Sequence, residues 1–223
     1  VKKKRVVILG SGGFVSSEVK LLLDKKKILT KNIRRKDIDL SRDNSGYKLK
    51  KVIKKNDYIF FAAARAPVKN INMFIYNMKI LKNIEIGINK NKIKKILYLS
   101  SDAVYSDTKH KIHENSKTSP KNLHGQMHLL RENYLQNLYQ DKLCIVRPTL
   151  IYGSNDPHNG YGPNKFIRCA LQGRNIDLFG KGEEKRDHIY VKDVANIISN
   201  LLINKFYGKI NLATGKVYSF YSI

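Results

Sequence analysis

Short apolar runs alternate with longer amphipathic stretches from the first residues of this chain to about Tyr190. Such an alternation is typical of β-α-β units, in which consecutive parallel strands are connected by helices that cover the faces of one sheet. The 223 residues are enough for one large domain, or for one domain with a small additional lobe. We therefore predict an α/β fold with a doubly wound parallel sheet.

The expected strands are short and rich in β-branched and aromatic residues: Arg5 to Leu9, Asn32 to Arg35, Tyr58 to Ala62, Lys95 to Ser100 and Leu143 to Val146. The expected helices lie between them: one from near Gly13, then Ser45 to Lys54, Asn70 to Asn89 and Asn122 to Tyr139. In the last helix an apolar stripe at helical spacing predicts a buried face, formed by Leu123, Met127, Leu130 and Leu138.

After Pro148 the sequence becomes rich in Gly, Asn, Pro and Asp over Ile151 to Asn164, which predicts a long functional loop. A second, smaller region follows, with these expected elements: a helix over Lys165 to Gln172, a strand over Asn175 to Leu178, the segment Arg186 to Tyr190 and a helix over Lys192 to Leu202. The chain stops soon after a strand-like KINLATG, early for a complete second lobe, so whether this lobe is truncated stays open.

The chain carries 43 Lys and Arg against 18 Asp and Glu, a formal net charge of +25 that invites a nucleic-acid interpretation. The lysines are spread through every segment, without a basic stripe interleaved with aromatic residues, so we expect no nucleic-acid partner and some attraction of anionic substrates. No apolar run reaches the roughly 20 residues that span a bilayer, so we expect no membrane partner and a cytoplasmic location. Cys144 and Cys169 lie in apolar stretches and are expected to be buried free thiols.

A glycine-rich turn, VVILGSGGFVS, joins the first expected strand to the first expected helix. Glycine allows a tight turn and lets backbone N–H groups approach a pyrophosphate, while the helix N-terminus adds positive potential. The turn therefore favours dinucleotide binding over a merely structural role. The third position of the usual glycine spacing is Ser16, which we expect to move the helix slightly away from the strand.

Together with this turn, a series of blocks in a fixed order resembles the extended short-chain dehydrogenase/reductases, specifically the NAD-dependent epimerase/dehydratase group. The blocks span nearly the whole chain: GSGGFVS, DYIFFAAA, Asn77 on the following helix, LYLSSDAVYSD, HGQMHLLRE, RPTLIYG, GKGEEKRDHIYVKDVA and NLATG. One departure is Phe61, where the family commonly has His. The resemblance implies an NAD(P)-binding Rossmann domain over residues 1–150 and a partial substrate-binding lobe over residues 151–223, interleaved with the last Rossmann elements.

The resemblance also implies which residues contact the dinucleotide. After the second strand, two arginines and no acid until Asp37 favour the 2′-phosphate of NADP over the ribose hydroxyls of NAD. Three of these residues have an alternative to cofactor binding. Ala62 can serve only the packing of helix against sheet, Asp39 can cap a helix, and Asn77 can be an ordinary exposed helical residue. The expected cofactor-binding residues are Gly10, Ser11, Gly12, Gly13, Phe14, Val15, Arg34, Arg35, Asp39, Leu40, Ala62, Ala63, Ala64, Asn77, Ser100 and His128.

The expected catalytic centre departs from the family pattern. In this family a Ser or Thr hydrogen-bonds the reacting oxygen, a Tyr passes the proton, and a Lys four residues later lowers the pKa of that Tyr and holds the nicotinamide ribose. Ser101 in SSDAVYSD takes the Ser position. The Tyr and Lys positions fall on His124 and His128, because Gly125 and Glu132 match the family's YGxxKxxxE pattern.

Two histidines at i and i+4 lie on one helix face, so both can reach the same ligand. With an ordinary pKa of about 6.5, His124 can exchange the hydroxyl proton during hydride transfer, and His128 can keep the ribose hydrogen bond without most of a lysine's charge. A catalytically impaired NAD(P)-binding protein with a regulatory or assembly role is the alternative. A zinc site is disfavoured, because Gly125 stands where the helical zinc-protease motif has Glu, and no metal is expected.

Arg186 in KRDHIYVKD takes the position at which family members clamp the diphosphate of a nucleotide sugar, and a surface ion pair with Asp187 is the alternative. Tyr105 and Asn164 complete the expected substrate-binding set. We therefore predict an NAD(P)-dependent oxidoreductase or epimerase that acts on a nucleoside-diphosphate sugar. A homodimer is implied by the resemblance alone, and the sugar and the reaction outcome stay open.

Overall fold

The computed structural model of this chain describes residues 4–106, 108, 110–157 and 159–223. Six parallel strands form a central sheet in the order β2-β1-β3-β4-β5-β8. Their bounds are β1 Arg5–Leu9, β2 Leu29–Ile33, β3 Tyr58–Phe61, β4 Lys95–Leu99, β5 Leu143–Pro148 and β8 Gly208–Leu212. The prediction of an α/β fold with a parallel sheet is confirmed.

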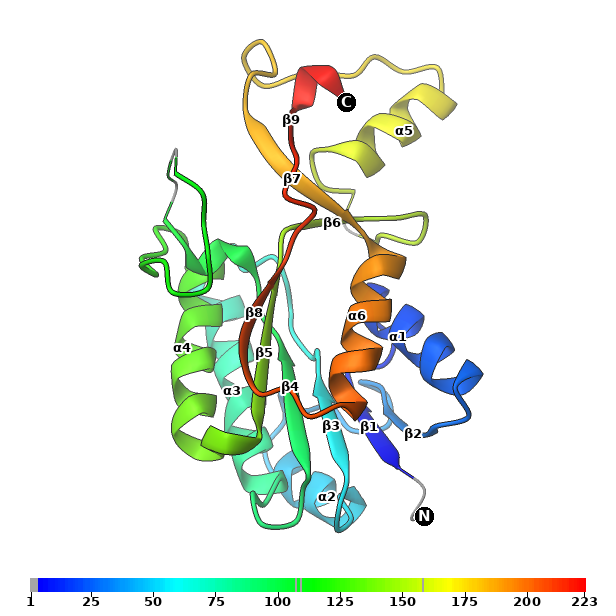
Figure 1. Cartoon of the computed structure of the whole chain (residues 1–223), viewed down its shortest axis with the longest axis vertical. Coiled ribbons are helices and arrows are strands. Elements are labelled where there is room, and N and C mark those ends of the chain that lie inside the picture. Colours follow the sequence, from blue (N-terminus) through cyan, green and yellow to red (C-terminus); the bar gives the residue numbers. More distant parts are fainter. Residues whose placement is uncertain (1–3, 107, 109, 158) are drawn as a thin grey trace.

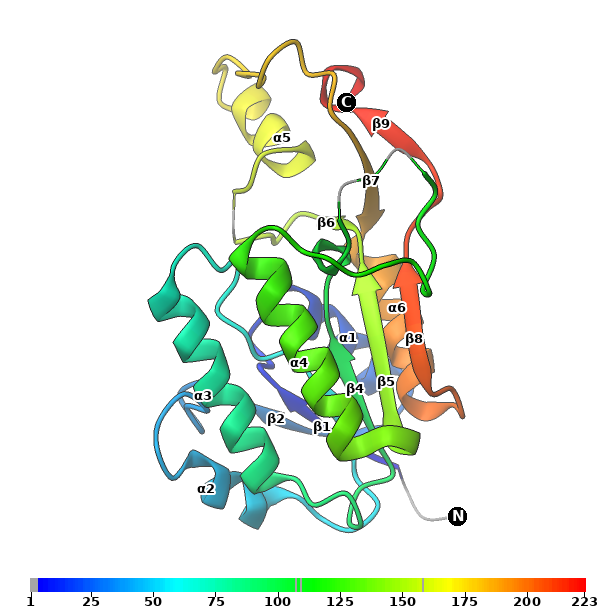
Figure 2. The same cartoon turned by 90° about the vertical axis from the view of Figure 1, so that its left-hand side faces the viewer.

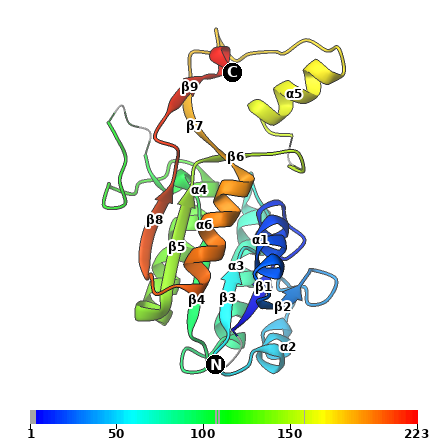
Figure 3. The same ribbon diagram turned by 45° about the vertical axis from the view of Figure 1, so that its right-hand side comes forward.

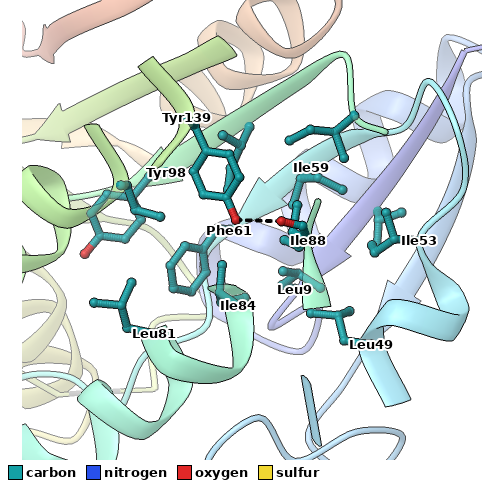
Figure 4. Close-up of a cluster of buried hydrophobic side chains, with 14 of the residues drawn as sticks. Leu9, Leu49, Ile53, Ile59, Phe61, Leu81, Ile84, Ile88, Tyr98 and Tyr139 are labelled. Carbon is teal, nitrogen blue, oxygen red and sulfur yellow. Dashed lines mark hydrogen bonds between the residues drawn. The ribbon is translucent and has the colours of Figure 1, made fainter. Parts of the chain in front are cut away.

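Helices cover both faces of the central sheet (Figures 1 and 2). One face carries α2 (Ser45–Val52), α3 (Ile71–Gly87) and α4 (Leu123–Tyr139), and the other carries α1 (Phe14–Lys25) and α6 (Val191–Ile203). Successive side chains of a strand point to opposite faces, so the adjacent Phe60 and Phe61 enter the two different apolar cores. Figure 4 shows the core that contains Phe61, where the Tyr139 hydroxyl donates a 3.1 Å hydrogen bond to the Ile88 carbonyl.

The second strand lies earlier in the chain than predicted, over Leu29–Ile33 instead of Asn32 to Arg35. The Ile33 carbonyl accepts hydrogen bonds from the backbone N–H groups of Gly10 and Ser11, and the chain turns away from the sheet after it. Arg34 and Arg35 therefore lie beyond the strand, at the carboxyl edge of the sheet.

The buried face of α4 also differs from the predicted apolar stripe. Met127 is fully buried as predicted, but Leu130 is 41% exposed. The face that packs against the sheet instead includes Arg131 and Glu132, whose charged groups are buried because they find hydrogen-bond partners there. A stripe counted from apolar residues alone misses this rotation of the helix.

A smaller sheet, in the order β6-β7-β9, lies above the carboxyl edge of the central sheet (Figures 1 and 3). The elements of this lobe are β6 Leu150–Tyr152, α5 Pro163–Leu171, β7 Lys185–Tyr190 and β9 Val217–Ser219. Strands β6 and β9 were not predicted, and the predicted strand over Asn175 to Leu178 is wrong: its mostly exposed residues pair with no strand among the described residues.

Helix α6 and strand β8 follow residue 150 in sequence but belong to the central sheet and its cover. The chain therefore passes through the lobe and returns, while the division at residue 150 stays a prediction. Cys144 and Cys169 are buried and free, as expected. Within the described residues, no helix has both the length and the apolar character that a bilayer crossing requires.

Candidate active site

The glycine-rich turn lies at the base of a cavity of about 600 Å³ at the carboxyl edge of the central sheet. Gly10 has a φ of +87°, and a Cβ atom there would lie 2.8 Å from the Ala63 Cα atom, so only glycine lets β1 turn this close to the end of β3. Gly12 has open space around it. Gly13 precedes α1 without a side-chain cap, so the first N–H groups of this helix remain available to an anion.

The opposite wall of this first cavity comes from the segment after β2. Arg34 pairs with Asp37 through an Nε–Oδ2 distance of 3.1 Å, and Arg35 pairs with Asp39 at 3.3 Å. The predicted residues that line the cavity are Gly10, Gly12, Gly13, Arg34, Arg35, Asp39, Leu40, Ala62, Ala63 and Ala64. The capping alternative for Asp39 is wrong, because its carboxylate accepts from Ser41 and the residue that precedes α2 is Asn44.

Two buried polar atoms near this turn have no hydrogen-bond partner among the described residues: the Ser11 Oγ atom and the Asn32 Oδ1 atom. Ser11 is part of the turn, and Asn32 precedes the residue whose carbonyl anchors it. A buried polar atom without a partner costs about 1–3 kcal/mol, but neither residue lines the first or the second cavity. The glycine-rich turn and the free helix end are therefore the features here that fit a dinucleotide.

A second cavity of about 460 Å³ adjoins the first one and shares Gly13, Ala62, Ala64 and Arg65 with it. Its wall brings the predicted catalytic residues together. The predicted residues found there are Gly13, Phe14, Val15, Ala62, Ala64, Ser100, Ser101, His124 and His128. A ligand that extends from the glycine-rich turn along the sheet edge therefore reaches both histidines.

Ser101 is held near α4 by a short helical segment that packs against the start of α4. Ser101 precedes a short 3-10 helix over Asp102–Val104, and its hydroxyl accepts a 3.1 Å hydrogen bond from the Ala103 N–H. This 3-10 helix lies directly on the start of α4, where a Cβ atom on Gly125 would collide with the Ala103 carbonyl oxygen. Gly125 is therefore required for this approach, whichever residue precedes it.

The two histidine rings meet edge to face, with centroids 4.7 Å apart and planes at 88°. His128 is 5% exposed, and its Nδ1 atom lies 2.7 Å from the Tyr98 hydroxyl oxygen. Burial lowers the pKa of His128 well below the ordinary 6.5, and the neighbouring His124 and Arg131 lower it further. The ring is therefore neutral at pH 7, and it supplies a hydrogen bond without a charge.

A buried ion pair anchors the loop after β4 to the surrounding elements. Arg147 on β5 binds Glu132 on α4, with an Nη2–Oε2 distance of 2.5 Å and both side chains 1% exposed. The Ser100 hydroxyl donates to the same carboxylate at 2.5 Å. Arg147 also donates to the Tyr105 hydroxyl, which in turn donates to Asn211 on β8. The Tyr105 hydroxyl is therefore occupied by protein groups.

Asn77 is fully buried, so the exposed-position alternative is wrong. Its side-chain carbonyl accepts from the Arg65 N–H at 3.1 Å and from Arg131 at 3.0 Å, while its amide donates to the carbonyls of Arg65 and Met73. These bonds use its hydrogen-bonding groups within the protein. Asn77 thus shapes the cavity wall by holding the Arg65 backbone.

On the lobe side, a third cavity of about 250 Å³ contains His124, Asn164 and His188 in its wall. The Asn164 side chain accepts from the Gly153 N–H and donates to Asp156. Both ring nitrogens of His188 are buried without a hydrogen-bond partner among the described residues, and burial lowers the pKa of this ring. The cavity therefore offers a neutral imidazole to a polar ligand.

Arg186 lies apart from the histidines, beside a further cavity of about 580 Å³ that Asp102 and Tyr105 also line. Arg186 forms an ion pair with Glu184 at 2.5 Å, and among the described residues it forms none with Asp187, so that alternative is wrong. Successive side chains of an extended chain point to opposite sides. Those of residues 184 and 186 therefore lie on one side and can pair, while that of residue 187 lies on the other. Burial raises the pKa of Asp102, which is adjacent to Ser101.

The cavity residues that were not predicted include Arg65, Asp102 and His188. Tyr98, the hydrogen-bond partner of His128, was not predicted either. Arg65 carried a usable signal, because it directly follows the alanines at the carboxyl end of β3. Tyr98 carried none, since its contact with His128 depends on how α4 lies across β4.

Comparisons with known proteins bear on the family and the fold of this chain. The family model described as "NAD dependent epimerase/dehydratase family" matches residues 6–213. An undecaprenyl-diphospho-N-acetylglucosamine 4-epimerase of Escherichia coli O157:H7 is 31% identical over 133 residues, which cover 57% of this chain but only 39% of that enzyme. A UDP-N-acetyl-alpha-D-glucosaminuronate decarboxylase of Bacillus cytotoxicus is 27% identical over 93% of this chain and 74% of its own length.

Among solved structures, a UDP-N-acetylglucosamine 4-epimerase from Methanobrevibacter ruminantium M1, in complex with UDP-N-acetylmuramic acid, superposes with a TM-score of 0.76. It is 26% identical, and the match covers 99% of this chain and 79% of that one. The similarity thus extends over both the central sheet and the lobe.

Proposed function

The chain belongs to the NAD-dependent epimerase/dehydratase family, and from this membership we propose that it is an NAD(P)-dependent oxidoreductase or epimerase of a nucleoside-diphosphate sugar. The observation that carries the proposal is the junction of the first two cavities. One is lined by the glycine-rich turn and the other by Ser101, His124 and His128, and they share four wall residues. A dinucleotide of extended shape fits such a pair of connected cavities.

In this proposal the start of α1 holds the pyrophosphate, because the first N–H groups of this helix have no intrahelical partners. The N–H groups of Gly10, Ser11 and Gly13 donate to backbone carbonyls and fix the shape of the turn instead. Arg34 and Arg35 line the first cavity, and their charges favour the 2′-phosphate of NADP over NAD. Lys36 and Arg65 add further cations to the same cavity, and the Arg65 guanidinium carbon lies 5.7 Å from the Tyr76 ring centroid. His128 holds the nicotinamide ribose with a neutral ring.

When bound, the nicotinamide supplies hydride exchange with the sugar carbon. Ser101 orients the reacting oxygen, since its hydroxyl can exchange the long 3.3 Å bond to Asp102 for one to a substrate. His124 exchanges the proton of that oxygen, because its ring lies in the walls of both the second and the third cavity. His188, which lines the third cavity, binds a sugar hydroxyl in this proposal, and Arg186, which also pairs with Glu184, binds the diphosphate.

A second function, NAD(P) binding with impaired catalysis, is favoured by one specific observation. The neutral His128 lacks the positive charge with which a lysine at this position lowers the pKa of the proton donor. A protein of this kind would serve in regulation or assembly, and it would bind dinucleotide without converting any sugar.

The experiment combines binding and turnover. Calorimetry with NADH and NADPH tests the first cavity, and a panel of UDP- and dTDP-sugars then tests turnover with the bound cofactor. We expect His124→Gln to lower kcat at least 100-fold with nucleotide affinity changed less than twofold. The exposed His113 provides the matched control, since His113→Gln should change neither quantity.

Three outcomes separate the proposals. Turnover that depends on His124 supports the enzyme, and binding without turnover of any sugar selects the impaired protein. Absence of NADH and NADPH binding at millimolar concentration would overturn both.

A further inference from the structure

The phenol of Tyr98 makes a short contact with His128, the ring at the position of the family's lysine. Tyr98 lies near the end of β4, 1% exposed, and its hydroxyl oxygen is 2.7 Å from His128 Nδ1. Tyr98 is stacked at a tilt between Phe61 and His128, with ring centroids 5.1 Å and 5.9 Å away. The contact is therefore short, buried and held from two sides.

From this contact we infer that Tyr98 is a positioning residue that holds His128 in the tautomer with its proton on Nε2. His128 then offers a hydrogen-bond donor to the cavity. The inference rests on the proposed role of His128 toward the dinucleotide, and it adds the group that prepares His128 for that role.

The direction of the hydrogen bond follows from the phenol's surroundings. Burial raises the pKa of Tyr98, so the phenol keeps its proton. Among the described residues, His128 Nδ1 is the one group in a hydrogen bond with the phenol that could accept this proton, and the nearby Arg131 carries only donors. If Nδ1 itself carried the proton, the phenolic O–H would stay buried without an acceptor. Tyr98 therefore donates, and Nδ1 accepts.

The remaining proton of His128 follows from the charge of the ring. His128 is kept neutral by burial and by the neighbouring His124 and Arg131, so it carries a single N–H. With Nδ1 engaged by Tyr98, this N–H is on Nε2. His128 lines the second cavity, where Nε2 is the nitrogen left for a ligand. A ribose hydroxyl would thus meet a donor, as it would from a lysine, but without the positive charge.

Arg131 is a charged residue next to Tyr98 and His128, and it favours the same protonation state. Its guanidinium is fully buried, and it donates to the carbonyl of Ala63, which lines the first cavity, and to the carbonyl of Asn77 on α3. The positive charge beside the phenol favours electron density on its oxygen and disfavours a proton on the nearby imidazole. Three elements, β4, α3 and α4, therefore fix the donor state of His128.

The test measures the tautomer directly, by nitrogen chemical shifts in protein labelled with ¹⁵N-histidine, and His128→Gln identifies the signals of this ring. For the wild type at pH 7 we expect an unprotonated Nδ1 and a protonated Nε2. In Tyr98→Phe we expect a mixture of both tautomers and an NADPH Kd about tenfold higher.

The matched control is Tyr139→Phe. Tyr139 is also 1% exposed, belongs to the same core and loses a 3.1 Å hydrogen bond to the Ile88 carbonyl, but it does not contact His128. We expect this variant to lose stability comparably while the His128 tautomer and the NADPH Kd stay as in the wild type. An effect of Tyr98→Phe that Tyr139→Phe reproduces would show a merely structural role and overturn the inference.

The wild-type spectrum alone decides the matter if Tyr98→Phe does not fold, because a proton on Nδ1 of His128 contradicts the inference. The inference and the proposed function also fail separately. If the wild type binds no dinucleotide, the proposed function is contradicted. A wild type that binds NADPH with the opposite tautomer ends only the role of Tyr98.

Discussion

The glycine-rich turn and the helix that carries the two histidines face connected cavities but are shaped by different kinds of atoms. At the turn, the decisive contacts are between backbone atoms, such as the approach of Gly10 to the Ala63 backbone. At α4, the decisive contacts are between buried side chains: Glu132 with Arg147, and Tyr98 with His128.

This difference explains where the chain departs from its family. Backbone amides bind phosphate whatever the neighbouring side chains are, so the turn can tolerate Ser16 where the usual spacing has glycine. Proton exchange depends on side-chain identity, so the predicted replacement of Tyr and Lys by histidines requires surrounding side chains that suit an imidazole. Four predictions test this contrast.

The greatest change should come from the side-chain network. Glu132→Gln leaves the Arg147 guanidinium buried without a counter-charge, which should lower the free energy of unfolding by about 3–5 kcal/mol. Urea unfolding followed by circular dichroism measures it. The exposed pair of Lys90 with Asp141 supplies the control, because Asp141→Asn should cause no measurable change. Equal effects of the two substitutions would show that burial of the first pair has no energetic consequence.

The second prediction concerns the backbone at the turn. Gly10→Ala places a side chain at a φ of +87° and against the Ala63 backbone, so we expect a loss of about 1–3 kcal/mol in unfolding free energy and no detectable NADPH binding. Gly12→Ala should leave stability unchanged, because no atom lies within 4 Å of the position that its new Cβ atom would take. Calorimetry measures nucleotide binding. Normal binding by Gly10→Ala would contradict the view that the close approach of backbone atoms at the turn is required for it.

The third prediction is a pH dependence at His128. Its folded-state pKa lies below the ordinary 6.5, so below that pH the unfolded chain takes up a proton that the folded chain does not. Stability is therefore fully present above pH 6.5 and is lost as the pH falls, at up to about 1.4 kcal/mol per pH unit. The difference between wild type and His128→Gln in urea unfolding from pH 7 to 5 isolates this contribution. Identical slopes would mean that His128 titrates normally.

The fourth prediction concerns cofactor choice, where the change should be slight. The Arg35 side chain is 76% exposed, so Arg35→Ala should raise the NADPH Kd only about two- to fivefold and leave the NADH Kd unchanged. Arg42 also approaches Asp39, at 3.7 Å, but does not line the first cavity, which makes Arg42→Ala the matched control. An equal loss of affinity for NADPH and for NADH would contradict the proposed preference for NADP.

Much of the fold could be predicted because its signals are local. The strand Arg5–Leu9 was predicted at its observed bounds, and the turn after it follows from the glycines alone. The strand β9 could not be predicted, because Val217–Ser219 is extended only through its antiparallel pairing with Lys185–Asp187, some thirty residues earlier in the chain. The lobe depends on such distant pairings more than the central sheet does.

The candidate site divides in the same way. Residue order alone indicated that a glycine-rich turn precedes a helix and that His124 and His128 share one helix face, since both follow from spacing along a regular backbone. Only the tertiary structure showed that Tyr98 faces His128, that Arg186 pairs with Glu184 and that Leu130 points to solvent. Side-chain partners, burial and proton positions depend on which surfaces meet, and periodicity within one element does not specify its neighbours.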